Sequence, residues 1–134
     1  MPRCKLFLLA GAVMLLAGCR TLYCTSSEFD KTARKYDELI RWGESQKACL
    51  AYVDPALKDD CLKRGAKAGD VKVVDYRVKL TECNTEKGEA TARVEFDYLS
   101  IPSTKLRTVE DVQSWRYLEK EMIWQLTTLP PEFP

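Results

Sequence analysis

Histidine is absent from all 134 residues of this chain. Its absence excludes Ser-His-Asp triads, histidine general bases and histidine metal ligands. No two cysteines stand at Cys-x-x-Cys spacing, so neither a zinc ribbon nor a thioredoxin-like redox site is indicated. The formal net charge is only +1 and there is no basic block, so the charge pattern gives no reason to expect nucleic-acid binding. We find no repeat, no low-complexity tract and no catalytic motif, and we expect neither a cofactor nor a metal.

The N-terminus has the pattern of a secretory signal. Arg3 and Lys5 make its start positive, and residues 6–17 form an unbroken apolar run. These twelve residues fall within the roughly 7–15 that a signal peptide uses and well below the roughly 20 that a membrane-spanning helix needs. Residues 1–18 are therefore predicted to be a signal peptide.

A four-residue motif, Leu16-Ala17-Gly18-Cys19, follows this run and resembles the lipobox of bacterial lipoproteins. The resemblance implies that the Cys19 sulfur receives a diacylglycerol and that the peptide bond before Cys19 is cut. Two or more acyl chains hold a protein stably on a membrane, so Cys19 would tether the domain. Arg20, where an Asp would mark inner-membrane retention, favours the outer membrane, facing the periplasm. The alternatives are an ordinary signal peptide with an incidental cysteine and an uncleaved anchor.

The remainder is predicted to be a single domain. Residues 19–26 would be the lipidated cysteine and a short tether, and residues 27–134 the folded domain. Seven extended residues reach about 25 Å, so we expect the domain to lie close to the membrane.

Helical periodicity covers residues 26–65. Ser26 and Ser27 are candidate N-caps, and Gly43 ends a first helix that runs to about Trp42. Its apolar face is spaced by three and four residues and comprises Phe29, Ala33, Tyr36 and Ile40. Its solvated sides are predicted to carry Lys31, Arg34, Lys35, Asp37 and Glu38. Ser45 starts a second helix, and Asp54-Pro55 a third that ends at Gly65.

From Val71 onward the apolar period changes to two, which predicts strands. The first strand is predicted to bury Val74, Tyr76, Val78 and Leu80, and the second Ala90, Ala92, Val94, Phe96 and Tyr98. A third strand is predicted over residues 105–118, with a bulge near Glu110-Asp111 where the alternation slips. A fourth carries Met122, Trp124 and Leu126.

Six cysteines stand at positions 4, 19, 24, 49, 61 and 83. Once the signal and the lipidated Cys19 are set aside, four remain, which allow up to two disulfides in three connectivities. Cys49 and Cys61 lie on neighbouring short helices, so we expect a disulfide between them. Buried reduced thiols are the alternative.

Helices followed by consecutive antiparallel strands indicate an α+β fold, with the N-terminal helices packed on a four-stranded sheet. With a curved sheet this order resembles the NTF2-like (cystatin-like) cone. Four stretches are similar to a pattern in small lipoproteins of proteobacteria: Arg41-Trp42-Gly43, Tyr52-Val53-Asp54-Pro55, residues 112–117, and Trp124-Gln125-Leu126 before Leu129-Pro130. The resemblance covers nearly the whole mature chain and implies a fold but no catalytic residue.

Enzymes of the NTF2-like group use carboxylates and tyrosines inside the cone, where burial shifts their pKa values. Here the predicted inner strand faces carry tyrosines but no carboxylate, because Asp75 and Asp97 alternate outward. A one-residue slip would turn them inward. The candidates to line a pocket, or to fill the core, are Tyr36, Tyr76, Tyr98, Trp115 and Trp124. Trp42 is a further candidate for a pocket or a partner surface.

We therefore expect a membrane-tethered, non-enzymatic domain of the bacterial envelope that binds a small ligand or docks on another envelope protein. The alternative is a cone-fold enzyme using Tyr/Asp acid–base chemistry. A purely structural accessory of a larger envelope assembly is a third reading.

Overall fold

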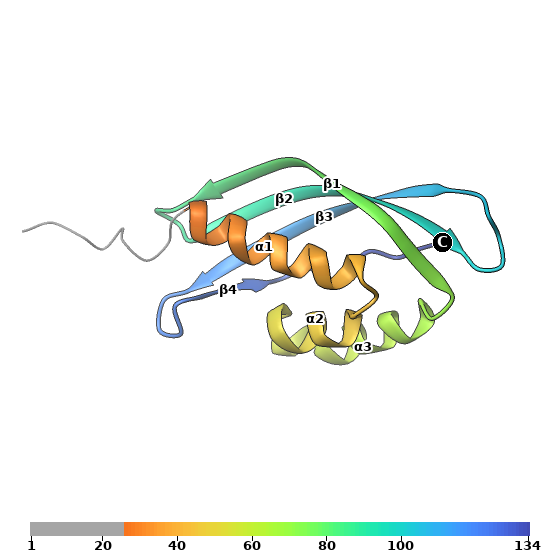
Figure 1. The fold of residues 1–134 in the computed structure, drawn as a ribbon. Helices are drawn as coiled ribbons and strands as arrows, with labels where there is room; N and C mark the ends of the chain where they lie inside the picture. Colours follow the sequence, from red (N-terminus) through yellow and green to blue (C-terminus); the bar gives the residue numbers. More distant parts are fainter. Residues whose placement is uncertain (1–25) are drawn as a thin grey trace, which may run out of the picture.

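Three α-helices precede four antiparallel strands in the structure, a computed structural model that describes residues 26–134 (Figure 1). The helices are α1 (Ser26–Arg41), α2 (Ser45–Tyr52) and α3 (Lys58–Lys67), with a short 3-10 turn η1 (Pro55–Leu57) before α3. The strands are β1 (Val71–Asn84), β2 (Glu89–Ser100), β3 (Arg107–Leu118) and β4 (Ile123–Leu126). This order confirms the predicted α+β class. The predicted signal peptide, Cys19 and all of the tether except Ser26 lie outside the described residues.

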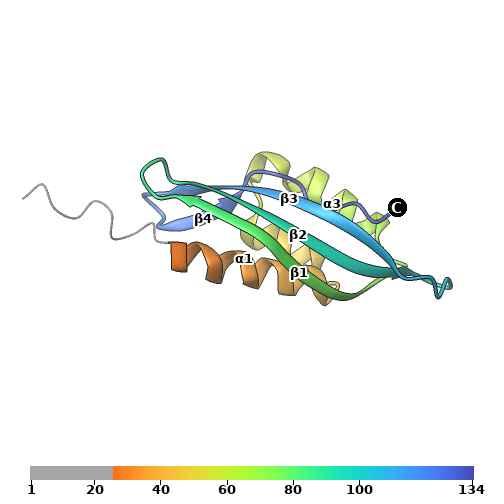
Figure 2. The same cartoon turned by 90° about the horizontal axis from the view of Figure 1, so that it is seen from above.

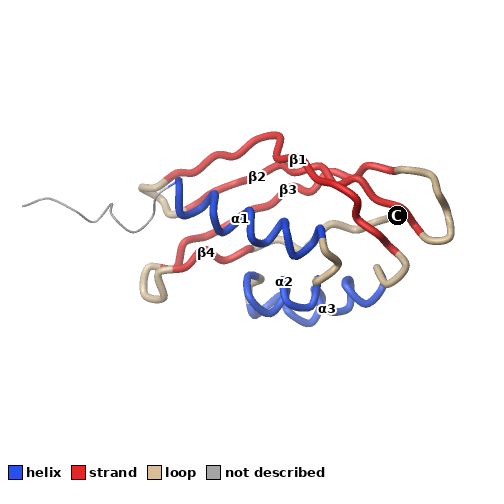
Figure 3. The backbone as a smooth tube through the Cα atoms, viewed as in Figure 1, coloured by secondary structure: helices blue, strands red, loops and turns tan. Residues whose placement is uncertain are grey.

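The sheet is an open meander in the order β1-β2-β3-β4, so every strand pairs with its neighbours in sequence. Helix α1 runs beneath β1 and β2, while α2 and α3 lie toward β4 (Figure 1, Figure 2). Short turns join β1 to β2 and β3 to β4 at one end of the sheet, and a longer loop joins β2 to β3 at the other (Figure 3). The start of α1 lies at the end with the short turns.

Helix α1 buries the predicted apolar stripe, because Phe29, Ala33, Tyr36 and Ile40 are each at most 5% exposed. The helix ends where Gly43 adopts a φ of +71°, a conformation that favours glycine. The Gly43 amide donates to the Ile40 carbonyl there, at 3.1 Å. One prediction for this helix is wrong: Asp37 is buried and not solvated.

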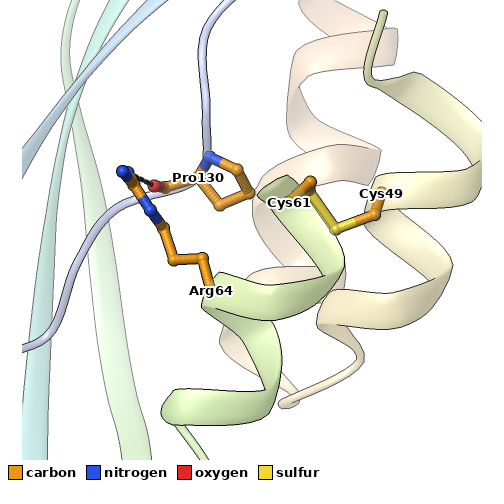
Figure 4. The surroundings of a disulfide bond; sticks show 4 residues. All are labelled: Cys49, Cys61, Arg64 and Pro130. Carbon is orange, nitrogen blue, oxygen red and sulfur yellow. Dashed lines mark hydrogen bonds between the residues drawn. A yellow bond between two sulfur atoms is a disulfide. The ribbon is translucent and has the colours of Figure 1, made fainter. Parts of the chain in front are cut away.

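Helices α2 and α3 form a cross-linked pair. The predicted disulfide between Cys49 and Cys61 is confirmed, with a Cα–Cα distance of 5.8 Å (Figure 4). Asp54 caps η1 as expected, because its side chain accepts a hydrogen bond from the Ala56 amide. On the other side of the disulfide, the Arg64 guanidinium donates to the Pro130 carbonyl at 2.7 Å and so ties α3 to the C-terminal segment (Figure 4).

The strands bear out the predicted alternation in β2 and depart from it in β1 and β3. All five predicted inward residues of β2 are buried. In β1, register shifts between Val73 and Asp75 and between Val78 and Leu80 change which residues face inward. Val73, not Val74, therefore pairs with Tyr98 and is buried, and Leu80 is paired with Arg93 on the outer face.

Strand β3 begins at Arg107, two residues later than predicted, and pairs with β2 without any shift in register. The predicted bulge near Glu110 is therefore wrong. The apolar alternation is interrupted in the sequence because two polar residues, Asp111 and Gln113, occupy inward positions of a regular strand.

The core between α1 and the sheet is largely aromatic. The Phe29 ring makes edge contacts with Trp115 and Trp124, at centroid distances of 5.9 and 5.1 Å, and Tyr36 packs on Trp115 at 5.5 Å. Such edge-to-face contacts contribute about 0.5–1.5 kcal/mol each beyond their buried area. The C-terminal Phe133 closes the far end of the core against Tyr98.

Candidate functional site

Two carboxylates and a carboxamide meet inside this core. Asp37 comes from the buried face of α1, next to Tyr36, while Asp111 and Gln113 come from the inner face of β3. All three are 4% exposed or less. Asp and Gln are seldom fully buried unless their polar atoms have partners, so this cluster is the most unusual feature of the interior.

The Gln113 carboxamide provides hydrogen-bond partners for both acids of the cluster. Its Nε2 donates to Asp37 Oδ1 at 2.8 Å and to Asp111 Oδ2 at 2.9 Å, which uses both of its hydrogens. Its Oε1 accepts from Trp115 Nε1 at 3.1 Å. One side chain thus bridges two acids and orients a tryptophan.

Burial makes both acids weak. It raises the pKa of Asp37 from 3.8 to about 7, and the negative charge of Asp111 adds to the rise, while the hydrogen bond from Gln113 opposes it. Burial likewise raises the pKa of Asp111 to about 6, opposed by Gln113 and by the positive charge of Arg64. Both acids therefore take up a proton at a higher pH than an exposed aspartate does, and Asp37 does so near neutral pH.

Tyr36 adds a phenol to this region. Its hydroxyl is buried and has no hydrogen-bond partner among residues 26–134. Burial, with the charges of Asp111 and Asp37, raises the pKa of Tyr36 well above its usual value. The phenol thus stays neutral.

A small cavity reaches Asp37 from one side. Its volume is about 190 Å³, and it lies between α1 and the inner face of β1 and β2. It is lined by Asp30, Ala33, Arg34, Asp37, Val78, Thr81 and Ala92. Pockets that bind drug-sized ligands usually measure about 300–1,000 Å³, so this one has room for a few waters only.

A second arrangement lies on the surface, at the end of α1. Trp42 is 68% exposed, yet its ring is held from two sides. Its Nε1 donates to Glu38 Oε2 at 3.0 Å, and the Arg41 guanidinium lies 4.5 Å from the ring centroid. The other oxygen of Glu38 accepts from the Tyr76 hydroxyl at 2.8 Å. We call Glu38, Arg41, Trp42 and Tyr76 the aromatic patch.

The candidate pocket residues fall into two groups. Four of them, Tyr36, Tyr98, Trp115 and Trp124, are at most 3% exposed and pack as core residues. Tyr76 is half-buried and belongs to the aromatic patch, where burial and then the bond to Glu38 raise its pKa to about 12. Lining of a pocket by these five residues stays a prediction.

The two acids weighed as inward candidates face outward, as their alternation predicted. Asp97 accepts two hydrogen bonds from the Arg77 guanidinium, at 2.6 and 3.0 Å, and one from Thr108. These bonds lower the pKa of Asp97 to about 2. Asp75 Oδ1 accepts a hydrogen bond from the adjacent backbone amide of Tyr76 at 2.8 Å. The inward acids are Asp37 and Asp111, which sequence reasoning assigned to solvent and to a bulge.

Comparisons with known proteins add little. No family model matches the chain, and no curated protein matches it. A solved structure, the intermembrane space region of the chloroplast protein ARC6, is similar at 12% sequence identity and a TM-score of 0.42. The similarity covers 73% of this chain and 92% of that one. Among the described helices, none has the length and apolar character needed to cross a membrane.

Proposed function

We propose that this chain is a lipoprotein of the bacterial envelope whose folded domain is tethered to the outer membrane, on its periplasmic side, through a lipid on Cys19. The lipobox at residues 16–19 and the short tether before α1 support this proposal. The disulfide between Cys49 and Cys61 is also in keeping with an oxidising compartment. We further propose that the fold is an NTF2-like cone, because helices followed by a four-stranded meander are the order which that fold requires.

Within this setting we propose that the domain is non-catalytic and docks on another envelope protein. The aromatic patch carries this proposal. Tryptophan, tyrosine and arginine dominate the energetics of protein interfaces, and immobilised side chains lose less entropy on binding. Glu38 and Arg41 hold the Trp42 ring in place before any partner arrives.

Binding of a small ligand in the interior, the other form of the non-catalytic proposal, is less favoured. The core between α1 and the sheet is filled by Phe29, Tyr36, Trp115 and Trp124. The cavity at Asp37, about 190 Å³, is below the range of ordinary ligand pockets.

The docking proposal is tested with a photoreactive aromatic amino acid placed at position 42 of the full chain in a Gram-negative host. We expect illumination to give one discrete adduct with an envelope protein. Glu38→Ala should reduce its yield at least fivefold, because it removes the hydrogen bond from Tyr76 that still orders the patch once Trp42 is replaced. The same probe at Val112, which is 53% exposed but lies on the outer sheet face, is the control. Equal adducts at both positions, or no adduct at position 42, would contradict the proposal.

A second candidate is a cone-fold enzyme using Tyr/Asp acid–base chemistry. One observation favours it: Asp37, with a pKa of about 7, borders a cavity and follows Tyr36 in sequence. A general acid or base works best with a pKa near the operating pH. This candidate requires reagents to reach Asp37, so labelling by a water-soluble carbodiimide and an amine would support it, and protection of Asp37 would count against it.

A further inference from the structure

A cavity of about 290 Å³ lies at the end of the molecule away from the start of α1. The end of α1, the end of α3, the start of β1 and the C-terminal segment form its walls. Two views at right angles place the start of β1 and the C-terminus toward this same end (Figure 1, Figure 2). The side chains that line it are mainly apolar and include Ile40, Val71, Val73, Pro130 and Phe133. We call it the apolar cavity.

Three glycines leave room in this cavity. Gly43, Gly65 and Gly69 line it near the ends of α1 and α3, and none of them contributes a side chain. A Cβ atom at Gly65 would come within 2.6 Å of the Ser45 Oγ, which belongs to another lining residue. The close approach of α2 to α3 therefore favours glycine at position 65, and it places a hydroxyl in an otherwise apolar wall.

A second cavity, of about 280 Å³, adjoins the first. Four residues line both cavities, namely Arg64, Ala68, Pro131 and Phe133. Lys67 and Glu132 also line the second one, which we call the basic cavity because two cations face one acid there. Lys67 is exposed and makes no ion pair within residues 26–134. Together the two cavities offer the space of an ordinary ligand pocket, which is about 300–1,000 Å³.

Arg64 is the charged group that the two cavities share. One guanidinium nitrogen donates to the Pro130 carbonyl oxygen at 2.7 Å, which holds the side chain in place (Figure 4). The Nη2 atom lies 3.1 Å from Glu132 Oε1, in an ion pair whose acid is 73% exposed. So exposed an ion pair contributes little to stability, because water competes for both charges. The Glu132 carboxylate thus marks a place where a carboxylate binds Arg64, and another carboxylate can replace it.

We propose that the two cavities bind a small organic acid. Its apolar body would pack against Val71, Val73 and Phe133, and its carboxylate would take the place of Glu132 on Arg64. Since the Pro130 carbonyl already fixes the guanidinium, less side-chain freedom is lost on binding. The site contains no residue of the aromatic patch and does not depend on a lipid at Cys19. Its failure would therefore leave both of those proposals standing.

The test is fluorine NMR of 4-fluorophenylacetate with the full chain, expressed with its signal in a Gram-negative host and purified in lipid nanodiscs, or in buffer if it is released from the membrane. The neutral 4-fluorophenylacetamide, of nearly the same shape, is the matched probe. We expect saturable line broadening of the acid that empty nanodiscs do not give. The amide should bind about tenfold more weakly, because hydrogen bonds between ionised groups are roughly twice as strong as neutral ones. No saturable broadening of the acid, or equal binding of acid and amide, would overturn the proposal.

A first pair of variants tests the place of binding. Ala68→Leu adds bulk where the two cavities meet and should weaken binding of 4-fluorophenylacetate at least fivefold. Ala66→Leu, two residues earlier and outside both linings, is the control and should leave the affinity unchanged. Equal effects of the two substitutions would overturn the assignment to these cavities.

A second pair tests the role of Arg64. Glu132→Gln removes the competing carboxylate, so it should strengthen binding of the acid about threefold or more, a gain that a merely structural role of Glu132 would not produce. Glu121→Gln, at an exposed position in the turn between β3 and β4, makes the same change of charge and should have no effect. Weaker or unchanged binding by Glu132→Gln would contradict the exchange of carboxylates on Arg64.

Discussion

Asp37 is an acidic side chain on the otherwise apolar buried face of α1. An ionised carboxylate removed from water costs several kcal/mol unless its partners compensate. Gln113 supplies one hydrogen bond to Asp37 and one to Asp111, but a carboxamide carries no charge to neutralise either acid. Burial therefore raises the pKa of both acids, and the cluster links α1 to the middle of β3.

We predict that Asp37→Asn changes the pH dependence of stability. The folded state raises the pKa of Asp37 from 3.8 to about 7, so the folded chain binds this proton more tightly than the unfolded chain does. The stabilisation that the protonated Asp37 gives the folded state is fully present below about pH 4 and is lost as the pH rises toward 7. The asparagine mimics the protonated acid, so the variant should be more stable than the natural chain at pH 8, by about 2–4 kcal/mol, and not at pH 4.

Urea unfolding followed by tryptophan fluorescence, at several values between pH 4 and pH 8, would measure this difference. Asp30→Asn, an exposed site on the same helix, is the control and should give a curve parallel to that of the natural chain. A parallel curve for Asp37→Asn as well would show that the carboxyl is not held protonated.

These residues also mark a limit of sequence reasoning. The sequence predicts that Asp37 is solvated because charged residues normally lie at the surface. It predicts a bulge near Asp111 because polar residues normally do not face a core. The sequence did contain a signal for the observed positions. Val109, Asp111, Gln113 and Trp115 are spaced by two residues, so in a regular strand all four face the same side as the buried tryptophan. A partner for the two acids could not be inferred, because Gln113 is 76 residues from Asp37.

Among the elements, α1 and β2 were predicted well because their apolar period is unbroken over their whole length. Strand β1 was predicted only in part. Each of its two register shifts inserts one extra residue into the strand. These insertions cannot be recognised in a sequence in which valines and polar residues alternate. Tyr76 and Val78 keep their predicted face, between the two shifts, whereas Val74 and Leu80 do not. The prediction that Val78 is buried is nevertheless wrong, because it is 50% exposed.

We predict that Val73 and Val74 differ sharply in their tolerance of a hydroxyl. Val73→Thr would bury a hydroxyl in the core and should lower the free energy of unfolding by about 1–3 kcal/mol. Val74→Thr, at a half-buried position beside the shift, is the matched control and should change it by about 0.5 kcal/mol or less. Urea midpoints of the two variants measure the difference. A larger loss for Val74→Thr would contradict the observed register.

On the scale of the whole molecule, α1 separates the tethered end from the aromatic patch. A helix rises 1.5 Å per residue, so Trp42 lies about 24 Å along the axis from Ser26. The tether before α1 adds at most about 25 Å. The proposed docking surface would thus stand a few tens of ångströms from the membrane, at the end of α1 away from the anchor.

The lipid anchor rests on the sequence alone, because Cys19 lies outside the described residues. The class of fold, the element order and the disulfide from Cys49 to Cys61 followed from periodicity, turn residues and spacing, and the structure confirms them. The cone and the lipid on Cys19 stay predictions.

The measurement that tests the central claim most directly is metabolic labelling with an alkyne fatty acid, followed by membrane fractionation, of the natural chain and of Cys19→Ser. We predict that the natural chain is labelled, shortened by 18 residues and found in the outer membrane, whereas Cys19→Ser is unlabelled and keeps its signal peptide uncut. Arg20→Asp, in an enteric host, is the control and should be labelled but shifted to the inner membrane. Label and normal processing in Cys19→Ser would contradict the account.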